Sequence, residues 1–107
     1  MATEYDYWLS FVIKQELGRD GRKYGERYQT LVAAIEDVSF PYWKETTSFY
    51  LLRTSLTIDE LAKHVRPAID ATKDTIIVRV LGHPTARIIG VYHDPTLTTF
   101  LPYLRQG

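Results

Sequence analysis

The hydrophobic period of this 107-residue sequence changes repeatedly along the chain, and that change limits the fold more than any other feature. Apolar residues alternate with their neighbours from Tyr7 to Ile13, which is the period of a β-strand. From Arg22 to Asp37 they recur at helical spacing, with Arg27 off the apolar stripe. Phe40–Glu45 and Ser48–Thr54 again favour strands, separated by a tight turn. The first half therefore predicts strand, helix, strand, strand.

The second half opens with a helix start signal. Thr57 and Glu60 form a T-x-x-E capping box, in which a hydroxyl and a carboxylate satisfy backbone N–H groups of the first turn. Pro67 removes a helical hydrogen bond, so we expect a break near Arg66. Thr75–Leu81 is the strongest strand signal in the chain.

The order of these six elements is that of the split βαββαβ, or ferredoxin-like, α+β fold. It predicts a four-stranded antiparallel sheet with two helices on one face. An additional C-terminal strand is expected at Ala86–Tyr92, and the tail Thr96–Gln106 favours a short helix or an added strand. The prolines and glycines are scattered and no repeat occurs, so residues 1–107 are expected to form a single domain.

The first strand is apolar on both of its faces. Trp8 and Val12 alternate with Leu9 and Phe11, although two helices cover only one face of the predicted sheet. The second face needs a cover, and a second copy of the chain is the simplest one. The pattern therefore predicts a homodimer.

Composition narrows the class of protein further. The chain has 13 basic and 13 acidic side chains, so bulk charge does not drive it onto nucleic acid or a membrane. It has no cysteine, which excludes a disulfide scaffold and a thiolate zinc site. No run approaches 18 apolar residues, and the short acidic start is unlike a secretory signal. We expect a cytoplasmic protein without membrane contact.

One loop carries the densest group of basic residues. The stretch Gly18–Gly25 is rich in glycine and precedes a helix, whose N-terminus attracts phosphate. If nucleic acid is a partner, the expected contacts are Arg19, Arg22, Lys23 and Arg27. The other interpretation is an ordinary solvated loop in which neighbouring carboxylates offset the charge.

Residues with catalytic or metal-binding chemistry form no known motif. His83, His93 and Asp94 flank one predicted hairpin, as either a small metal site or exposed turn residues, and His64 is expected on a helix surface. The 14 aromatic residues either stack on bases or, more simply, fill the core and an interface. We expect no cofactor, no metal and no catalytic residue.

Four segments resemble the SinR-like group of small bacterial proteins, which is related to the CRISPR spacer-acquisition endonuclease-like family and the VapD toxin family. The matching segments are Phe40–Trp43, Ser48–Thr54, Thr57–Pro67 and Asp74–Gly82, and the first strand fits as well. The resemblance implies a ferredoxin-like fold that dimerises, with the extra strand after Gly82 helping to join the subunits.

The chain departs from that group at one decisive position. Those families end the first strand in an aspartate that binds a divalent metal, whereas this sequence has Val12 there, and Mg²⁺ requires oxygen ligands. The nearest carboxylates are Asp6 and Glu16. We therefore expect a non-catalytic dimeric interaction or scaffold module whose partner is nucleic acid or protein. The alternatives are a metal-dependent nuclease and, by fold analogy alone, a small-ligand regulatory domain.

Overall fold

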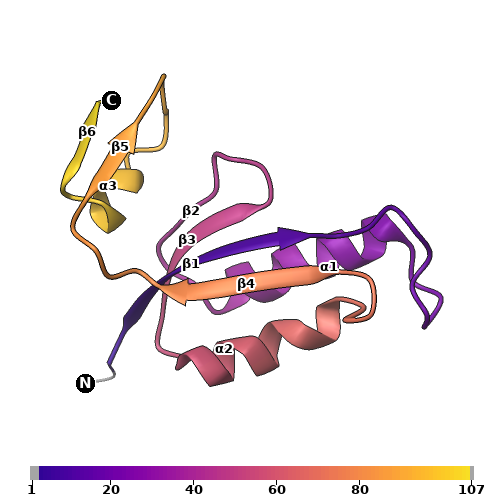
Figure 1. The fold of residues 1–107 in the computed structure, drawn as a ribbon. Coiled ribbons are helices and arrows are strands. Elements are labelled where there is room, and N and C mark those ends of the chain that lie inside the picture. Colours follow the sequence, from indigo (N-terminus) through magenta and orange to yellow (C-terminus); the bar gives the residue numbers. More distant parts are fainter. Residues whose placement is uncertain (1–2, 107) are drawn as a thin grey trace.

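A four-stranded antiparallel sheet organises the molecule in the computed structural model, which describes residues 3–106 (Figure 1). Its strands are β1 (Tyr5–Val12), β2 (Tyr42–Trp43), β3 (Phe49–Thr54) and β4 (Thr75–Val80). Their order across the sheet is β2-β3-β1-β4, so β1 lies inside the sheet and β4 forms an edge. The predicted α+β class with an antiparallel sheet is confirmed.

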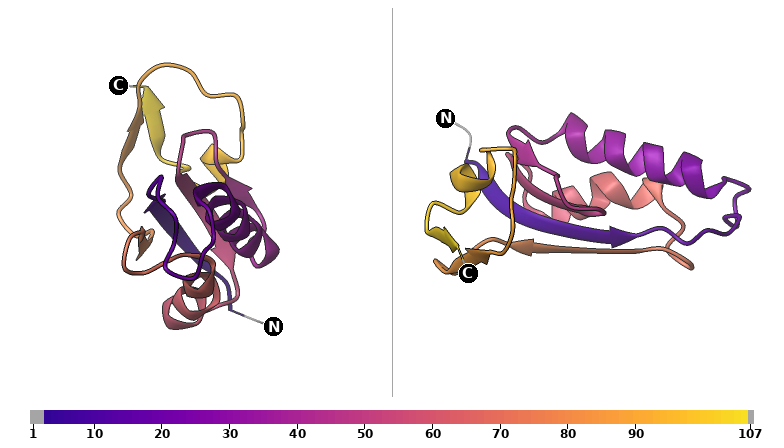
Figure 2. Two further views of the ribbon diagram at one scale, coloured as in Figure 1. Left: turned by 90° about the vertical axis from the view of Figure 1, so that its right-hand side faces the viewer. Right: turned by 90° about the horizontal axis from the view of Figure 1, so that it is seen from above.

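Two helices lie on the same face of this sheet (Figure 2). Helix α1 (Tyr24–Asp37) begins two residues later than predicted, because Arg22 and Lys23 belong to the preceding loop. Helix α2 (Ile58–Val65) has the predicted cap. It ends in a 3₁₀ turn, η1 (Arg66–Ala68), at the predicted break: Pro67 lies at the start of this turn, where its missing N–H costs little.

The main core fills the space between the sheet and the two helices. Strand residues with odd numbers in β1, such as Leu9, point toward Leu31 and Ile35 of α1, and all three side chains are fully buried. Leu9 lies opposite Tyr50 of β3 and Val78 of β4, so these neighbours share its face. The alternation predicted for the first strand is therefore the alternation of the core.

The C-terminal segment differs from the prediction. Strand β5 (Ala86–Ile88) stops short of Tyr92, because Gly90 has a φ of +95° and turns the chain out of extended conformation. Helix α3 (Leu97–Phe100) and strand β6 (Leu104–Gln106) follow. β5 pairs in parallel with β6 in a separate two-stranded sheet. The expected additional strand thus exists but does not join the four-stranded sheet of its own chain.

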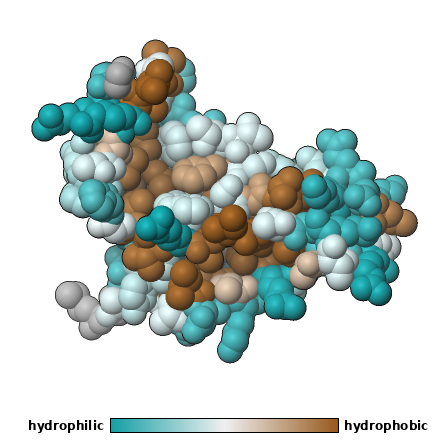
Figure 3. Space-filling model, in the orientation of Figure 1, coloured by the Kyte–Doolittle hydropathy of each residue, from teal (hydrophilic) through white to brown (hydrophobic). Residues whose placement is uncertain are grey.

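The second face of the sheet is covered at one end by this C-terminal segment. Leu97 and Phe100 pack against Trp43 and Leu51, and all four side chains are buried. The chain itself therefore supplies part of the cover that the sequence assigned to a partner subunit. Further along the face Ile77 is 55% exposed, and brown apolar surface gathers over β1 and β4 (Figure 3).

Candidate functional site

The structure separates the four basic residues of the predicted phosphate-binding loop. The side chain of Arg27 is fully buried and forms an ion pair of 2.8 Å with the equally buried Asp74. The remaining N–H groups of its guanidinium donate to the backbone oxygens of Lys14, Glu16 and Arg22. Arg27 therefore holds the loop together and is unavailable to a phosphate, which corrects its assignment as a contact residue. Its spacing of four residues from Leu31 is the signal that would have placed it on the buried face.

A buried pair of aspartates completes this arrangement. Asp74 also accepts hydrogen bonds from the N–H groups of Lys14 and Asp70. Burial opposes its ionisation, yet the bond from Arg27 and the two N–H groups lower its pKa. The pKa of Asp70 falls well below its ordinary value because the Arg19 N–H, at 2.7 Å, and Thr72 donate to its carboxylate. The network fastens the loop to the chain that precedes β4.

The other three basic residues have different surroundings. Arg22 is half-buried: its Nε pairs with Asp20 at 2.7 Å, and its Nη1 donates to the oxygen of Ala68 at 3.1 Å. Arg19 and Lys23 are exposed. The loop thus presents two of the four expected side chains, and Arg22 is partly committed to the fold.

Carboxylates do not replace the missing aspartate of the resembled nucleases within one copy of the chain. Asp6 is the second residue of β1 and pairs with Arg53 at 2.7 Å, whereas Glu16 follows the other end of β1 and pairs with Lys73 at 3.2 Å. The strand from Asp6 to Val12 alone spans roughly 20 Å, and Glu16 lies beyond that end. Val12, which stands where the resembled families have the aspartate, is 46% exposed on the second face of the sheet. No three histidine, aspartate or glutamate side chains gather at metal-binding distance among residues 3–106.

Each of the three histidines forms a hydrogen-bond contact within the fold. The Nε2 of His64 lies 3.0 Å from the oxygen of Ala34 and so links α2 to α1. The Nδ1 of His83 lies 3.0 Å from the Thr85 hydroxyl. The backbone N–H of His93 donates to Glu45 at 2.7 Å. Among residues 3–106, His83, His93 and Asp94 do not come together as a group that could hold a metal ion.

Glu45 is a structural contact that the sequence pattern did not reveal. Its carboxylate accepts hydrogen bonds from the N–H groups of His93 and Asp94 and from the indole of Trp43. These N–H groups, with that of Asp94 foremost, lower the pKa of Glu45. The bonds fasten the C-terminal segment to the turn between β2 and β3, across 48 residues of sequence.

Aromatic residues on the second face contact one another. The ring of Phe49 stacks with Trp8 at 6.2 Å and meets Trp43 edge-on at 6.4 Å. Arg53 lies over the ring of Phe100 at 5.7 Å. Trp43 and Phe100 are buried here, so most of this cluster is core of the C-terminal segment, as the simpler interpretation of the aromatic residues predicts.

The outer edge of β4 is the most open feature of the sheet. The Leu81 N–H donates to the backbone oxygen of Asp6 at 3.0 Å. The backbone N–H and C=O groups of the odd-numbered residues of β4 therefore point toward β1. By the alternation of antiparallel strands, Ile76, Val78 and Val80 then direct their backbone N–H and C=O groups outward. Among residues 3–106 no strand pairs with this edge.

A groove of about 380 Å³ runs beside the same edge. Its walls are side chains of β4, of α2 and of the turn after α2, and they include Ile76, Val65 and Ile69. Elsewhere on the molecule Ile89 and Val91 are 85% and 84% exposed, on either side of Gly90 in the segment that follows β5. The molecule thus combines an apolar strand edge with an exposed apolar segment of β-branched residues.

Within residues 3–106, no helix has the length and apolarity needed to cross a membrane. Searches of protein-family models and of curated proteins find no match to this chain.

Proposed function

We propose that this chain is a non-catalytic, homodimeric interaction module with a ferredoxin-like fold. The order β2-β3-β1-β4, with α1 and α2 on one face, supports that fold. The observation that carries the proposal is the exposure of Ile89 and Val91 in a chain whose β4 edge is open.

The two features complement each other chemically. An extended segment that adds to a strand edge forms main-chain hydrogen bonds, while its alternate side chains enter the neighbouring groove. Ile89 and Val91 have the required spacing of two residues, and on pairing Gly90 between them takes the extended conformation in place of its φ of +95°. The groove beside β4 is lined mainly by apolar side chains, with Lys63, Arg66 and Asp74 also in its lining. Full burial of each side chain contributes roughly 1.5–3 kcal/mol. By two-fold symmetry the segment after β5 of each copy adds to β4 of the other, so the contact occurs twice.

The mass in solution tests the dimer. Light scattering coupled to gel filtration should give twice the chain mass of 12.4 kDa at micromolar protein concentration. The double substitution Ile89→Lys/Val91→Lys should reduce the mass to that of one chain, because charged side chains are not buried in an apolar groove. Leu17→Lys, at another exposed apolar side chain, is the control and should remain a dimer. A wild-type mass of 12.4 kDa would contradict the proposal.

Nucleic acid is the proposed partner of the exposed loop residues Arg19 and Lys23. Each phosphate that a protein neutralises contributes about −0.9 to the slope of log K against log salt on duplex DNA. Arg19→Ala/Lys23→Ala should therefore weaken binding to all sequences alike and flatten the slope by about 2. Lys63→Ala/Arg105→Ala removes the same charge elsewhere and should change the slope less.

The binding assay is a gel shift with duplex and single-stranded DNA and RNA, with and without Mg²⁺. An unchanged salt slope in Arg19→Ala/Lys23→Ala would exclude this loop as the contact surface. Cleavage that requires Mg²⁺ would contradict the non-catalytic assignment and favour the nuclease class of the resembled families.

A further inference from the structure

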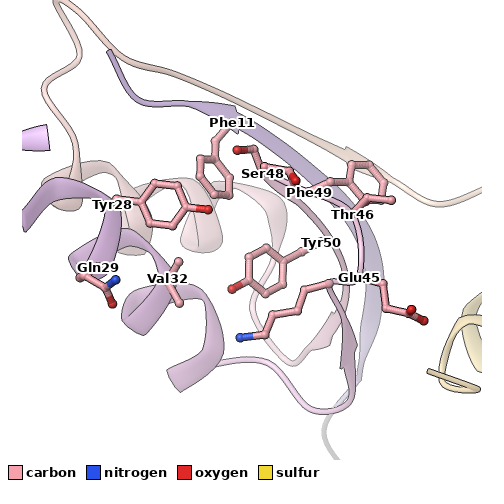
Figure 4. Close-up of a pocket in the computed structure, with 11 residues that line it drawn as sticks. Phe11, Tyr28, Gln29, Val32, Glu45, Thr46, Ser48, Phe49 and Tyr50 are labelled. Carbon is pink, nitrogen blue, oxygen red and sulfur yellow. The ribbon is translucent and has the colours of Figure 1, made fainter. Parts of the chain in front are cut away.

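A cavity of about 420 Å³ opens between α1 and the turn that joins β2 to β3 (Figure 4). Four aromatic residues from three different elements line it: Phe11 of β1, Tyr28 of α1, and Phe49 and Tyr50 of β3. Phe11 and Tyr28 meet edge-on with ring centres 5.5 Å apart. The volume lies within the range of small-ligand sites in proteins. Phe11 and Tyr50 are 6% and 3% exposed and belong to the main core, so the partly exposed Tyr28 presents the aromatic surface on the α1 side.

The side chains at the back of this cavity are held in place before any ligand arrives. Glu36 accepts a hydrogen bond of 2.7 Å from the Tyr50 hydroxyl and one of 2.9 Å from Tyr42, and it pairs with Lys44 at 2.5 Å. Burial opposes the ionisation of Glu36, but the bonds from Lys44, Tyr50 and Tyr42 lower its pKa. Burial, followed by the contact with Glu36, raises the pKa of Tyr50 far above the ordinary value, so its hydroxyl stays protonated and a donor.

The charges around the cavity are already compensated. The ammonium group of Lys44 is paired with Glu36, so the cavity has no spare positive charge for a phosphate. The side chain of Glu45 extends away from the cavity, and its carboxylate accepts the N–H groups of His93 and Asp94 (Figure 4). No carboxylate is left to attract a cation. The charge balance therefore favours an uncharged ligand group.

The rim provides both hydrogen-bond donors and acceptors. Gln29 contributes an amide, and Thr46, Thr47 and Ser48 contribute hydroxyls. A polar rim can form hydrogen bonds to a flat molecule that has polar groups around its edge. An acyl chain has no polar groups along its length, so it would leave these rim groups without partners. Aromatic walls with a neutral polar rim match a heterocyclic ring.

We propose that this cavity binds a nucleobase, which packs against the ring of Tyr28 and forms hydrogen bonds to Gln29 and the turn. The base belongs either to a free nucleoside or to an unpaired nucleotide of a single strand, since both present the same ring. The proposal is independent of the homodimer, because the cavity lies within one chain and away from the edge of β4.

Chemical-shift mapping on the isotope-labelled full chain tests the site. The probes are nucleosides with each of the four RNA bases at about 5 mM, above the millimolar Kd of a weak contact. A short single-stranded RNA and an abasic strand of equal length separate the two sources of the base. We expect shifts at Phe11, Tyr28 and Ser48 with the nucleosides. RNA that binds at least tenfold more tightly than the nucleosides identifies the strand as the source, and equal affinity identifies the free nucleoside.

Two substitutions localise the contact. Val32→Trp fills the cavity from α1 and should abolish the shifts at Phe11 and Ser48, and Gln29→Ala should weaken binding about tenfold by removing a hydrogen-bonding group. Thr30→Ala, the adjacent position on α1, is the matched control and should bind normally. Thermal unfolding shows whether each variant is folded, and Gln29→Ala tests the site if Val32→Trp does not fold.

Three results would overturn the proposal. The first is the absence of shifts at the cavity with nucleosides and RNA alike. The second is an abasic strand that binds as tightly as RNA and shifts the same residues, because the base would then be irrelevant. The third is unchanged binding in both folded Val32→Trp and Gln29→Ala.

Discussion

The guanidinium of Arg27 joins the loop before α1 to Asp74, the residue that precedes β4. It is fully buried with Asp74, and it also bonds three backbone oxygens. The sequence placed this residue among surface contacts because arginine is mostly an exposed residue type. What reverses that expectation is a carboxylate 47 residues away, which no local pattern connects to it.

Replacement of Arg27 by methionine should lower the free energy of unfolding by about 3–5 kcal/mol. The substitution leaves the carboxylate of Asp74 buried without its charged partner, which costs far more than the loss of an exposed pair. Urea denaturation measures the effect. Lys73→Met breaks the exposed pair with Glu16 and, as the control, should cost less than about 1 kcal/mol. Equal losses in the two variants would mean that Arg27 does not contribute through the buried pair.

Helix α2 shows how much a short sequence motif determines at the level of one element. The N–H of Glu60 donates to the Thr57 hydroxyl at 3.3 Å, and the N–H of Thr57 donates to the Glu60 carboxylate at 2.8 Å. The predicted capping box is confirmed, because all of its contacts lie within four residues and need no tertiary partner.

Thr57→Ala should destabilise the fold by about 1 kcal/mol, since the first turn of α2 loses an acceptor. The midpoint of thermal unfolding reports this loss. Ser55→Ala, two residues upstream in an exposed position, is the control. An unchanged midpoint in Thr57→Ala would show that the helix is stable without its cap.

On the scale of the whole molecule, the C-terminal segment packs on the sheet through a small apolar cluster of its own. Phe100 is 3% exposed in that cluster, which is separate from the main core between sheet and helices. Phe100→Ala should therefore release the segment and leave β1 to β4 folded. Hydrogen exchange should accelerate at α3 and β6 by far more than at β1. Arg105→Ala, exposed in β6, is the control, and uniform acceleration throughout the chain would show that the two clusters unfold together.

The sequence by itself determined the elements of the main sheet and its two helices. Period-two alternation marks β1, and runs of strand-favouring apolar residues mark β3 and β4. Helical stripes mark α1 and α2, and a local cap marks the start of α2. These signals are reliable because they depend on residues close together in the chain. β2 is much shorter than the predicted Phe40–Glu45, since only Tyr42 and Trp43 form the regular ladder with β3. Beyond them the Phe40 N–H still donates to the oxygen of Arg53, and the oxygen of Pro41 accepts from the Arg53 N–H.

Only the tertiary structure decided which surfaces are open. Whether Arg27 is buried depends on Asp74, and whether the second face is covered depends on Leu97 and Phe100 reaching Trp43. The cavity between α1 and the β2–β3 turn likewise brings Phe11, Tyr28 and Tyr50 together from three elements. Each arrangement joins residues distant in sequence. The hydrophobic effect behind the apolar contacts is non-directional, and the carboxylate that pairs with Arg27 lies 47 residues away, so the local residue pattern specifies neither kind of partner.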